Sequence, residues 1–113
     1  MRERLEAGSA WRCWIATEGG EIGGAVWLCL LEKVPNPVGE PEGHAYVTNF
    51  FVRPALRGRG VGSALLGAAL SECDRRGVDT VFLWPTPESR RLYERHGFEV
   101  RDDLMERRRW HAL

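Results

Sequence analysis

The sequence lacks several features that would assign it to a common class of protein. No apolar run approaches the roughly 18 residues that a membrane-spanning helix requires. The segment from Met1 to Glu6 is mostly charged, so it lacks the apolar core of a secretory signal peptide. With 113 residues, of which 43% are hydrophobic and 28% charged, the chain has the size and composition of a soluble domain. We therefore expect one domain over residues 1–113, with no membrane partner and a cytoplasmic location.

Cysteine is scarce, and its spacing excludes two kinds of site. Cys13, Cys29 and Cys73 are far apart, and no two of them form a Cys-x-x-Cys pair. A zinc knuckle or a redox motif therefore has no support, and we expect no metal. Each cysteine lies in an apolar stretch, where a free thiol usually packs as a small hydrophobic side chain. The three thiols indicate a reducing compartment.

Lysine is almost absent, since Lys33 is the only one among 16 basic residues. The formal net charge is zero, but residues 1–52 hold four basic and seven acidic side chains, whereas residues 53–113 hold twelve and nine. Broad nucleic-acid binding needs a basic face on the whole domain, so we expect no nucleic-acid partner. A basic second half is suited to a small polyanion, whose oxygens the planar guanidinium of arginine can pair with.

The first half of the sequence predicts antiparallel strands over residues 11–52, after a polar lead-in at residues 1–10. Gly19-Gly20 separates two apolar, β-prone segments and predicts a hairpin. Gly23-Gly24 predicts a bulge in the second strand of that hairpin. Residues 32–44 contain three prolines and two glycines and are expected to be irregular. The predicted strands are Trp11 to Thr17, Glu21 to Leu31 and Ala45 to Val52.

The second half, residues 53–113, alternates helical and strand patterns. A strand, a helix and a strand in succession across residues 45–84 imply a crossover with parallel pairing of the two strands. Gly77 and Gly97 follow basic last turns, as expected at the ends of two helices. The predicted elements are a helix from Val61 to Arg76, a strand from Thr80 to Trp84, a helix begun by the cap residue Thr86 and ending near His96, and a strand from Phe98 to Trp110 that is interrupted near residues 101–103. The fold class is therefore α/β, with a mixed sheet of the α+β kind.

One glycine-rich segment lies between a predicted strand and the start of a helix. Unpaired backbone N–H groups and the helix dipole make such a position suitable for a phosphate group. There is no Gly-Lys-Ser/Thr sequence, and Ser63 stands where Gly-x-Gly-x-x-Gly would need its third glycine, so two nucleotide motifs are excluded. The alternative is a tight turn with exposed arginines. The segment reads Arg57, Gly58, Arg59, Gly60, Val61, Gly62, Ser63.

This segment closely resembles the coenzyme A signature of the GCN5-related N-acetyltransferases. The family pattern Arg/Gln-x-x-Gly-x-Gly/Ala is met by Arg57, Gly60 and Gly62. A second family feature, Leu-Tyr-x-x-x-Gly-Phe, is met by residues 92–98, in the expected order and at the expected separation. The resemblance extends over about residues 11–110. It implies an acetyl-CoA-dependent N-acetyltransferase that acts on a primary amine of a small molecule or peptide.

The resemblance also implies where acetyl-CoA, the cosubstrate, lies. Two central parallel strands would splay apart, and the pantetheine arm would pair with backbone near Phe51 and Val52. The pyrophosphate would contact the backbone N–H groups of residues 58–63, with Arg57 and Arg59 nearby. Thr86 occupies a place where the family often has an asparagine that contacts coenzyme A, although capping a helix is its other role.

Tyr93 is the candidate catalytic residue by the same resemblance. Acyl transfer from a thioester to an amine expels a thiolate, which a neighbouring phenol can protonate. The alternative is a tyrosine packed between helix and sheet with its hydroxyl at the surface. The base that accepts the amine proton stays open among five polar residues: Glu40, Glu42, His44, Tyr46 and Asn49.

The chain departs from the family pattern at its start. Members usually have a strand and two helices before the hairpin, and these helices form a wall of the acceptor pocket. Only about ten residues precede the hairpin at Trp11. The interpretations are a minimal member, a shortened start, or a wall supplied by a second subunit, and exposed edges would favour a homodimer. The alternative function is a coenzyme A-binding or assembly module that lacks a complete acceptor site.

Overall fold

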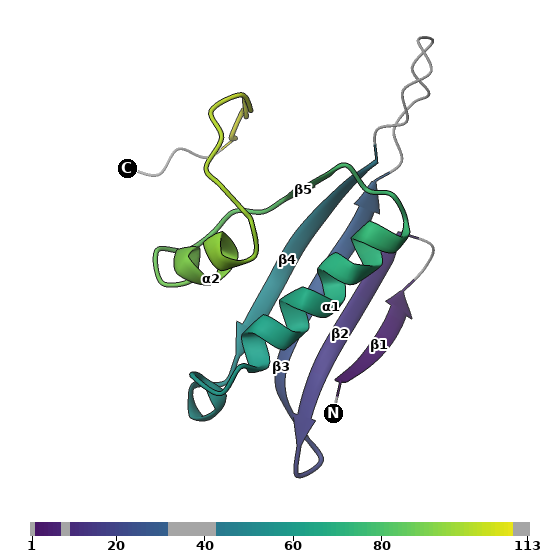
Figure 1. The fold of residues 1–113 in the computed structure, drawn as a ribbon, viewed down its shortest axis with the longest axis vertical. Helices are drawn as coiled ribbons and strands as arrows, with labels where there is room; N and C mark the ends of the chain where they lie inside the picture. Colours follow the sequence, from purple (N-terminus) through teal and green to yellow (C-terminus); the bar gives the residue numbers. More distant parts are fainter. Residues whose placement is uncertain (1, 8–9, 32–42, 110–113) are drawn as a thin grey trace.

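The fold of the described residues is a five-stranded sheet with one long helix lying across one of its faces (Figure 1). The computed structural model describes residues 2–7, 10–31 and 43–109. Its elements are β1 (Arg2–Ala7), β2 (Trp11–Glu18), β3 (Glu21–Leu31), β4 (His44–Val52), a 3-10 turn η1 (Pro54–Leu56), α1 (Val61–Arg75), β5 (Thr80–Phe82) and α2 (Arg90–Arg95). Most of the loop expected over residues 32–44, with Glu40 and Glu42, lies outside the described residues.

The strands follow the order of the sequence across the sheet, from β1 to β5. The neighbours from β1 to β4 are antiparallel, whereas β4 and β5 are parallel. A parallel pair needs a crossover connection, and α1 provides it. The predicted mixed α/β class and the parallel pairing across the helix are therefore confirmed.

The prediction that residues 1–10 form only a polar lead-in to the first strand is wrong. Residues Arg2–Ala7 form β1, which pairs antiparallel with β2 from Arg2 opposite Ala16 to Ala7 opposite Trp11. Four of its six residues are charged, which conceals the strand from a search for apolar patterns. Charged residues are common on edge strands, where they discourage pairing with another chain.

The hairpin predicted at Gly19-Gly20 is confirmed, and both glycines have positive φ, 60° and 81°. The bulge predicted at Gly23-Gly24 is also present. Gly24 lies opposite Ala16 and Ile22 opposite Thr17, so Gly23 is the extra residue. A Cβ atom at Gly23 would lie 2.2 Å from Leu56 Cδ1, so a larger residue there would require the Leu56 side chain to move.

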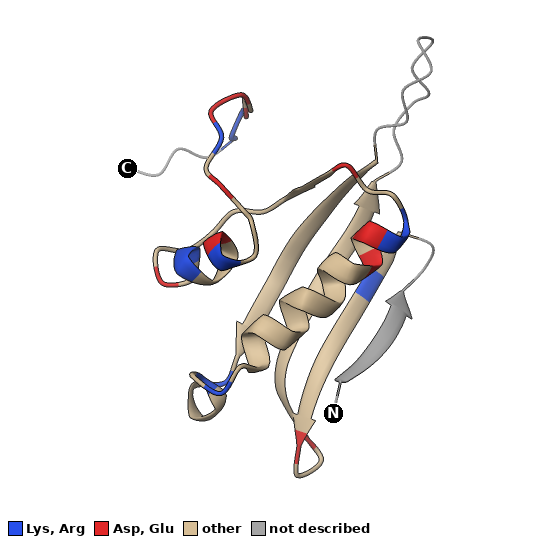
Figure 2. Cartoon of the chain, in the orientation of Figure 1, with Lys and Arg blue, Asp and Glu red and all other residues tan. Residues whose placement is uncertain are grey.

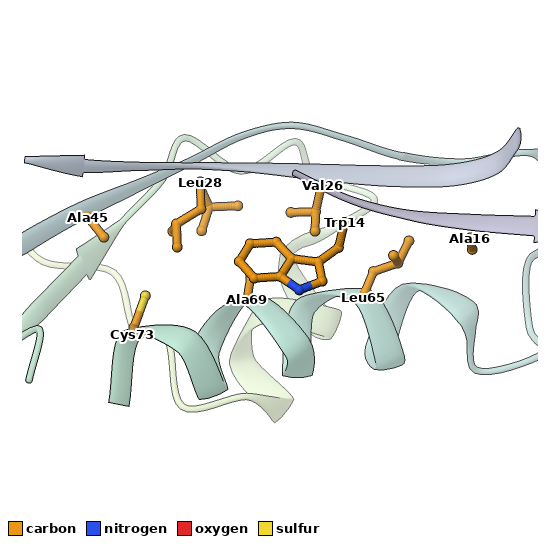
Figure 3. Close-up of a cluster of buried hydrophobic side chains, with 9 residues drawn as sticks. Trp14, Ala16, Val26, Leu28, Ala45, Leu65, Ala69 and Cys73 are labelled. Atoms are coloured by element: carbon orange, nitrogen blue, oxygen red, sulfur yellow. The ribbon is translucent and has the colours of Figure 1, made fainter. Parts of the chain in front are cut away.

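The core lies between α1 and the face of the sheet formed by alternate residues of β2, β3 and β4 (Figure 3). Trp14 and Leu28 project from the sheet toward Leu65, Ala69 and Cys73 of the helix. The helical periodicity predicted an apolar stripe through Leu65, and the structure buries Leu65 and its neighbour Leu66 completely. Packing of this one face therefore fixes α1 on the sheet.

Glu72 is a buried carboxylate on the same helix. Its side chain accepts hydrogen bonds from Arg75 and from Arg76 Nε, the latter at 2.5 Å. Although burial raises the pKa of Glu72, these two hydrogen bonds and the adjacent positive charges lower it to about 2. The carboxylate is therefore ionised at neutral pH.

The C-terminal part differs from expectation. The helix expected from Thr86 to about His96 is shorter, since a turn at residues 87–89 precedes α2. The strand expected from Phe98 to Trp110 is wrong, because residues 98–109 contain no strand and residues 99–109 are exposed. The apolar side chains of this segment, including Val100, Leu104 and Met105, are themselves exposed, so the segment has no buried row to hold it on the sheet. None of the described helices is long and apolar enough to cross a membrane.

Replacing Leu65 by alanine tests the core. We expect Leu65→Ala to lower the free energy of unfolding by about 3 kcal/mol, because it removes a fully buried side chain and leaves a cavity. Leu104→Ala is the matched control, since this leucine is 62% exposed, and should change stability by less than about 0.5 kcal/mol. Urea denaturation measures both, and equal effects would contradict the assignment of the core.

The buried carboxylate predicts a pH dependence. Because the pKa of Glu72 is lowered from 4.5 to about 2, its ionised form stabilises the fold above pH 4.5. That contribution decreases as the pH falls toward 2. Glu72→Gln should cost about 2 kcal/mol at pH 7, and this difference from the original protein should shrink between pH 4.5 and pH 2. A difference that stays constant with pH would show that the charge is not responsible.

Candidate functional site

The parallel strands β4 and β5 remain paired over only three residues. The pairs are His44 with Thr80, Ala45 with Val81 and Tyr46 with Phe82, and beyond them the strands separate. A groove of about 840 Å³ occupies the space where they diverge. Residues 46–52 of β4 line one side, and Trp84, Thr86, Leu92 and Tyr93 are among those that line the other. The predicted splay of two parallel strands is therefore a feature of this structure, but β5 lies at the edge of the described sheet and is not a central strand.

A bulge in β4 shapes this side of the groove. Phe51 lies opposite Ala25 and Thr48 opposite Trp27, so β4 has one residue more than β3 between these pairs. Within the bulge, Asn49 has a φ of 51°, which is uncommon for a residue other than glycine. Phe51 is 50% exposed and lies with Val52 along the groove, as predicted.

The glycine-rich loop lines one end of the groove. Gly58 and Gly60 have φ values of 78° and 81°, and a Cβ atom on either would meet no neighbour within 4 Å. Gly60 caps α1 without a side-chain hydrogen bond to the first turn. The loop that precedes α1 is blue in Figure 2, which shows its arginines beside the start of the helix. This end of the groove is open, positively charged and supplied with backbone N–H groups, as an anion site requires.

The two arginines of the loop have different surroundings. Arg57 Nε donates a hydrogen bond of 3.2 Å to the carbonyl of Val52, which ties the loop to the end of β4, and Arg57 lines the groove. Arg59 instead lies 3.7 Å from the carboxylate of Glu18. Arg59 and Val61 line a second, shallower hollow beside β2, whereas Gly58, Gly60, Gly62 and Ser63 line the groove. The structure thus brings most of the predicted loop residues together and sets Arg59 and Val61 apart.

Thr86 is held by a reciprocal pair of hydrogen bonds. Ser89 Oγ accepts from the N–H of Thr86 at 3.0 Å, and Thr86 Oγ1 accepts from the N–H of Ser89 at 3.3 Å. This is the arrangement of a capping box, in which both donors at the start of a helical turn are satisfied. Thr86 therefore caps the turn at residues 87–89 and not α2, whose N-cap is Ser89, and Thr86 also lines the groove.

Tyr93 lies between α2 and the sheet and is 7% exposed. Its ring contacts Phe50 and Phe98 edge-on, with centroids 6.0 and 5.7 Å apart. Burial raises the pKa of Tyr93 above its ordinary value of 10, and a hydrogen bond with Ser89 acts in the opposite direction. The phenol therefore keeps its proton at neutral pH while the residue lines the groove.

An aromatic cluster lies at the other end of the groove. Tyr46 stacks on Phe82 at 5.3 Å, and Trp84 contacts both rings edge-on. Trp84 is 50% exposed, and its indole N–H donates to Glu106 at 3.1 Å. Of the candidate bases, Tyr46 and Asn49 line the groove, whereas His44 begins β4.

Several residues near the groove were absent from the predicted site. Among them, Ser89, Leu92 and Arg95 line the groove, and His96 Nε2 lies 2.8 Å from Ser63 Oγ. Ser89 directly precedes α2 and lies four residues before Tyr93, so helical spacing could have indicated it. Nothing in the sequence pairs His96 with Ser63. Among the residues that the structure describes, no group of three or more His, Cys, Asp or Glu side chains is arranged to hold a metal ion.

These features define the class to which the chain belongs. The sequence model of the Acetyltransferase (GNAT) family matches residues 1–98. The chain is therefore a member of this acetyltransferase family, and the recognition of the two motifs is confirmed.

Two curated proteins show the same relationship. The chain is 36% identical over 86 residues to mycothiol acetyltransferase of Propionibacterium freudenreichii, covering 74% of the chain and 26% of that protein. It is 38% identical over 79 residues to an uncharacterised N-acetyltransferase of Methanocaldococcus jannaschii, covering 67% of the chain and 31% of that protein. The chain thus spans about a quarter to a third of the length of these relatives.

Solved structures share the fold. A GCN5-related N-acetyltransferase from Ralstonia eutropha has a TM-score of 0.75 at 28% identity, over 87% of this chain and 65% of that one. A predicted acetyltransferase from Clostridium acetobutylicum, solved with acetyl-CoA, has a TM-score of 0.77 at 23% identity, over 88% and 64%. This chain spans slightly less than two thirds of each structure.

Gly60 provides a test of the loop geometry. Gly60→Ala should lower the free energy of unfolding by about 1–2 kcal/mol, because an alanine is strained at this positive φ. The control is Gly67→Ala within α1, where a Cβ atom also meets no neighbour and where we expect a gain of about 0.5–1 kcal/mol. Thermal unfolding of both variants measures the contrast, and a stabilised Gly60→Ala would refute this account of the loop.

Proposed function

We propose that this chain is an acetyl-CoA-dependent N-acetyltransferase that transfers an acetyl group to a primary amine of a small molecule or peptide. The observation that carries the proposal is the groove between β4 and β5, which joins an open glycine-rich loop to a buried phenol. Membership of the acetyltransferase family supports the same chemistry.

The glycine-rich loop fits the pyrophosphate of the cosubstrate. The open space beside Gly58 and Gly60 permits close approach to the backbone, and the uncapped first turn of α1 supplies donors. Arg57 adds positive charge at the same end, where charge-assisted hydrogen bonds each contribute roughly 1.5–3 kcal/mol. We assign this binding role to Arg57, Gly58, Gly60, Gly62 and Ser63, whereas the ion pair of Arg59 with Glu18 argues for a smaller part for Arg59 and for Val61 beside it.

The edge of β4 fits the pantetheine arm. Beyond Tyr46 this edge is not paired with β5, so the backbone of the stretch that includes Phe51 and Val52 can pair with the amides of an extended ligand. Thr86 lies across the groove from this edge and supplies a hydroxyl to the same ligand.

Tyr93 acts as the general acid of the proposed reaction. Acetyl-CoA, when bound, supplies an acetyl group activated as a thioester. As the amine nitrogen bonds to the acetyl carbon and the carbon–sulfur bond breaks, Tyr93 donates its proton to the departing sulfur. The raised pKa keeps that proton on the phenol until negative charge develops. Tyr46 and Asn49, which line the groove, are the described candidates for accepting the proton of the amine, directly or through water.

The proposal also includes a cellular location and an oligomeric state for the enzyme. The three cysteines are free, which supports a reducing, cytoplasmic location. A homodimer remains the favoured assembly. The second candidate function is a coenzyme A-binding or assembly module without a complete acceptor site.

Tyr93→Phe tests the acid role. We expect release of free thiol from acetyl-CoA, measured with a panel of primary amines, to show a kcat at least about 100-fold lower, because the proton donor is lost. The Kd for acetyl-CoA, measured by calorimetry, should stay within about threefold. The matched control is Glu94→Gln, the exposed neighbour on the same helix, which should keep the original kcat.

The outcomes separate the candidates. An unchanged kcat in Tyr93→Phe would refute the acid role. Tight binding of acetyl-CoA by the original protein with no thiol release on any amine would select the binding module. Failure of acetyl-CoA to bind would refute both functions.

A further inference from the structure

Two residues from separate elements meet at the anion end of the groove. Ser63, the third residue of α1, places its Oγ 2.8 Å from Nε2 of His96. Ser63 lines the groove, and His96 directly follows α2, three residues after Tyr93. This hydrogen bond therefore joins the glycine-rich loop to the helix that carries the phenol.

Backbone hydrogen bonds hold the main chain around His96. The N–H of His96 donates to the carbonyl of Tyr93 at 2.9 Å, and the N–H of Phe98 donates to the same carbonyl at 3.1 Å. Between them Gly97 adopts a φ of 89°, which ends the helix in the left-handed conformation. The imidazole is thus attached to a defined helix end rather than to a free loop.

The direction of this hydrogen bond decides what Ser63 can do. A serine hydroxyl has one hydrogen to donate, whereas a phosphate oxygen in a diphosphate ester only accepts. If Ser63 donates to His96, its hydrogen is used and its oxygen repels the phosphate. If His96 donates from Nε2, the hydrogen of Ser63 is left for the ligand.

We propose that His96 is a positioning residue: with a hydrogen on Nε2, it donates to Ser63 and directs the hydroxyl hydrogen of Ser63 toward a phosphate oxygen of the cosubstrate. The inference rests on the proposed function, because it takes acetyl-CoA as the ligand of the groove.

The test compares two ligands, acetyl-CoA and S-acetylpantetheine, which lacks the pyrophosphate and the nucleotide. We expect His96→Leu to raise the Kd for acetyl-CoA about tenfold, the lower end of what a hydrogen bond to a charged group contributes. The Kd for S-acetylpantetheine, measured by NMR titration, should stay within about twofold. His96→Gln, whose amide can donate near the position of Nε2, should restore acetyl-CoA binding to within about threefold.

A double-mutant cycle links the effect to Ser63. Ser63→Ala should also weaken acetyl-CoA about tenfold, and adding His96→Leu to it should cause no further loss, because His96 acts through Ser63. Glu94→Gln, exposed on α2, is the control for a change near the same helix and should leave both Kd values unchanged.

Three results would overturn the inference. His96→Leu could bind acetyl-CoA as tightly as the original protein, or it could weaken both ligands equally, which a general disturbance of α2 would produce. Additive losses in the double variant would show that the two side chains act independently. In each of these three cases the original protein still binds acetyl-CoA, so the proposed function stands. If the original protein does not bind acetyl-CoA, both the proposed function and this inference fail.

Discussion

The brief pairing of β4 with β5 is the constraint on which the site depends. Three residue pairs hold the strands together, and the separation that follows exposes one edge of β4 inside the molecule. An interior strand edge without a partner is ordinarily unfavourable, because its backbone polar groups need hydrogen bonds. Here α1 packs across β2, β3 and β4, so the core stays closed while the edge stays open (Figure 1). The sheet is thus stabilised away from the groove, and the groove can be kept for a ligand.

Opposite physical requirements are met at different places along the groove. An anion is favoured where backbone donors are open to solvent and arginine is near, as at Gly58 and Gly60. A neutral phenol is favoured where a low dielectric penalises its ionised form, as at Tyr93. Phe50 and Phe98 surround the ring of Tyr93 and provide that environment. Charge and burial therefore give the two parts of the groove different chemical properties, which suit the proposed roles of anion binding and proton transfer.

The sequence predicted what short-range patterns determine. Glycine pairs located the hairpin and its bulge, helical periodicity located α1, and two motifs indicated the loop and Tyr93. It missed β1, whose charged residues follow from an edge position that only tertiary pairing reveals. It added a strand after Phe98, because exposed apolar residues such as Val100 and Leu104 imitate alternation. It did not indicate that Arg59 pairs with Glu18 or that His96 contacts Ser63, because contacts between residues far apart in the sequence leave no local pattern.

The length of α1 has a consequence for the size of the groove. From His44 to Val52, β4 advances about 26 Å, and the 15-residue helix returns the chain by about 21 Å. The chain therefore arrives near the beginning of β4, where Thr80 pairs with His44. One additional helical turn, about 5.4 Å, would carry the chain past this point, and one fewer would start β5 between one and two residues further along β4. The reach available to an extended ligand is thus set by the number of residues in a helix that contributes little of the groove's own surface.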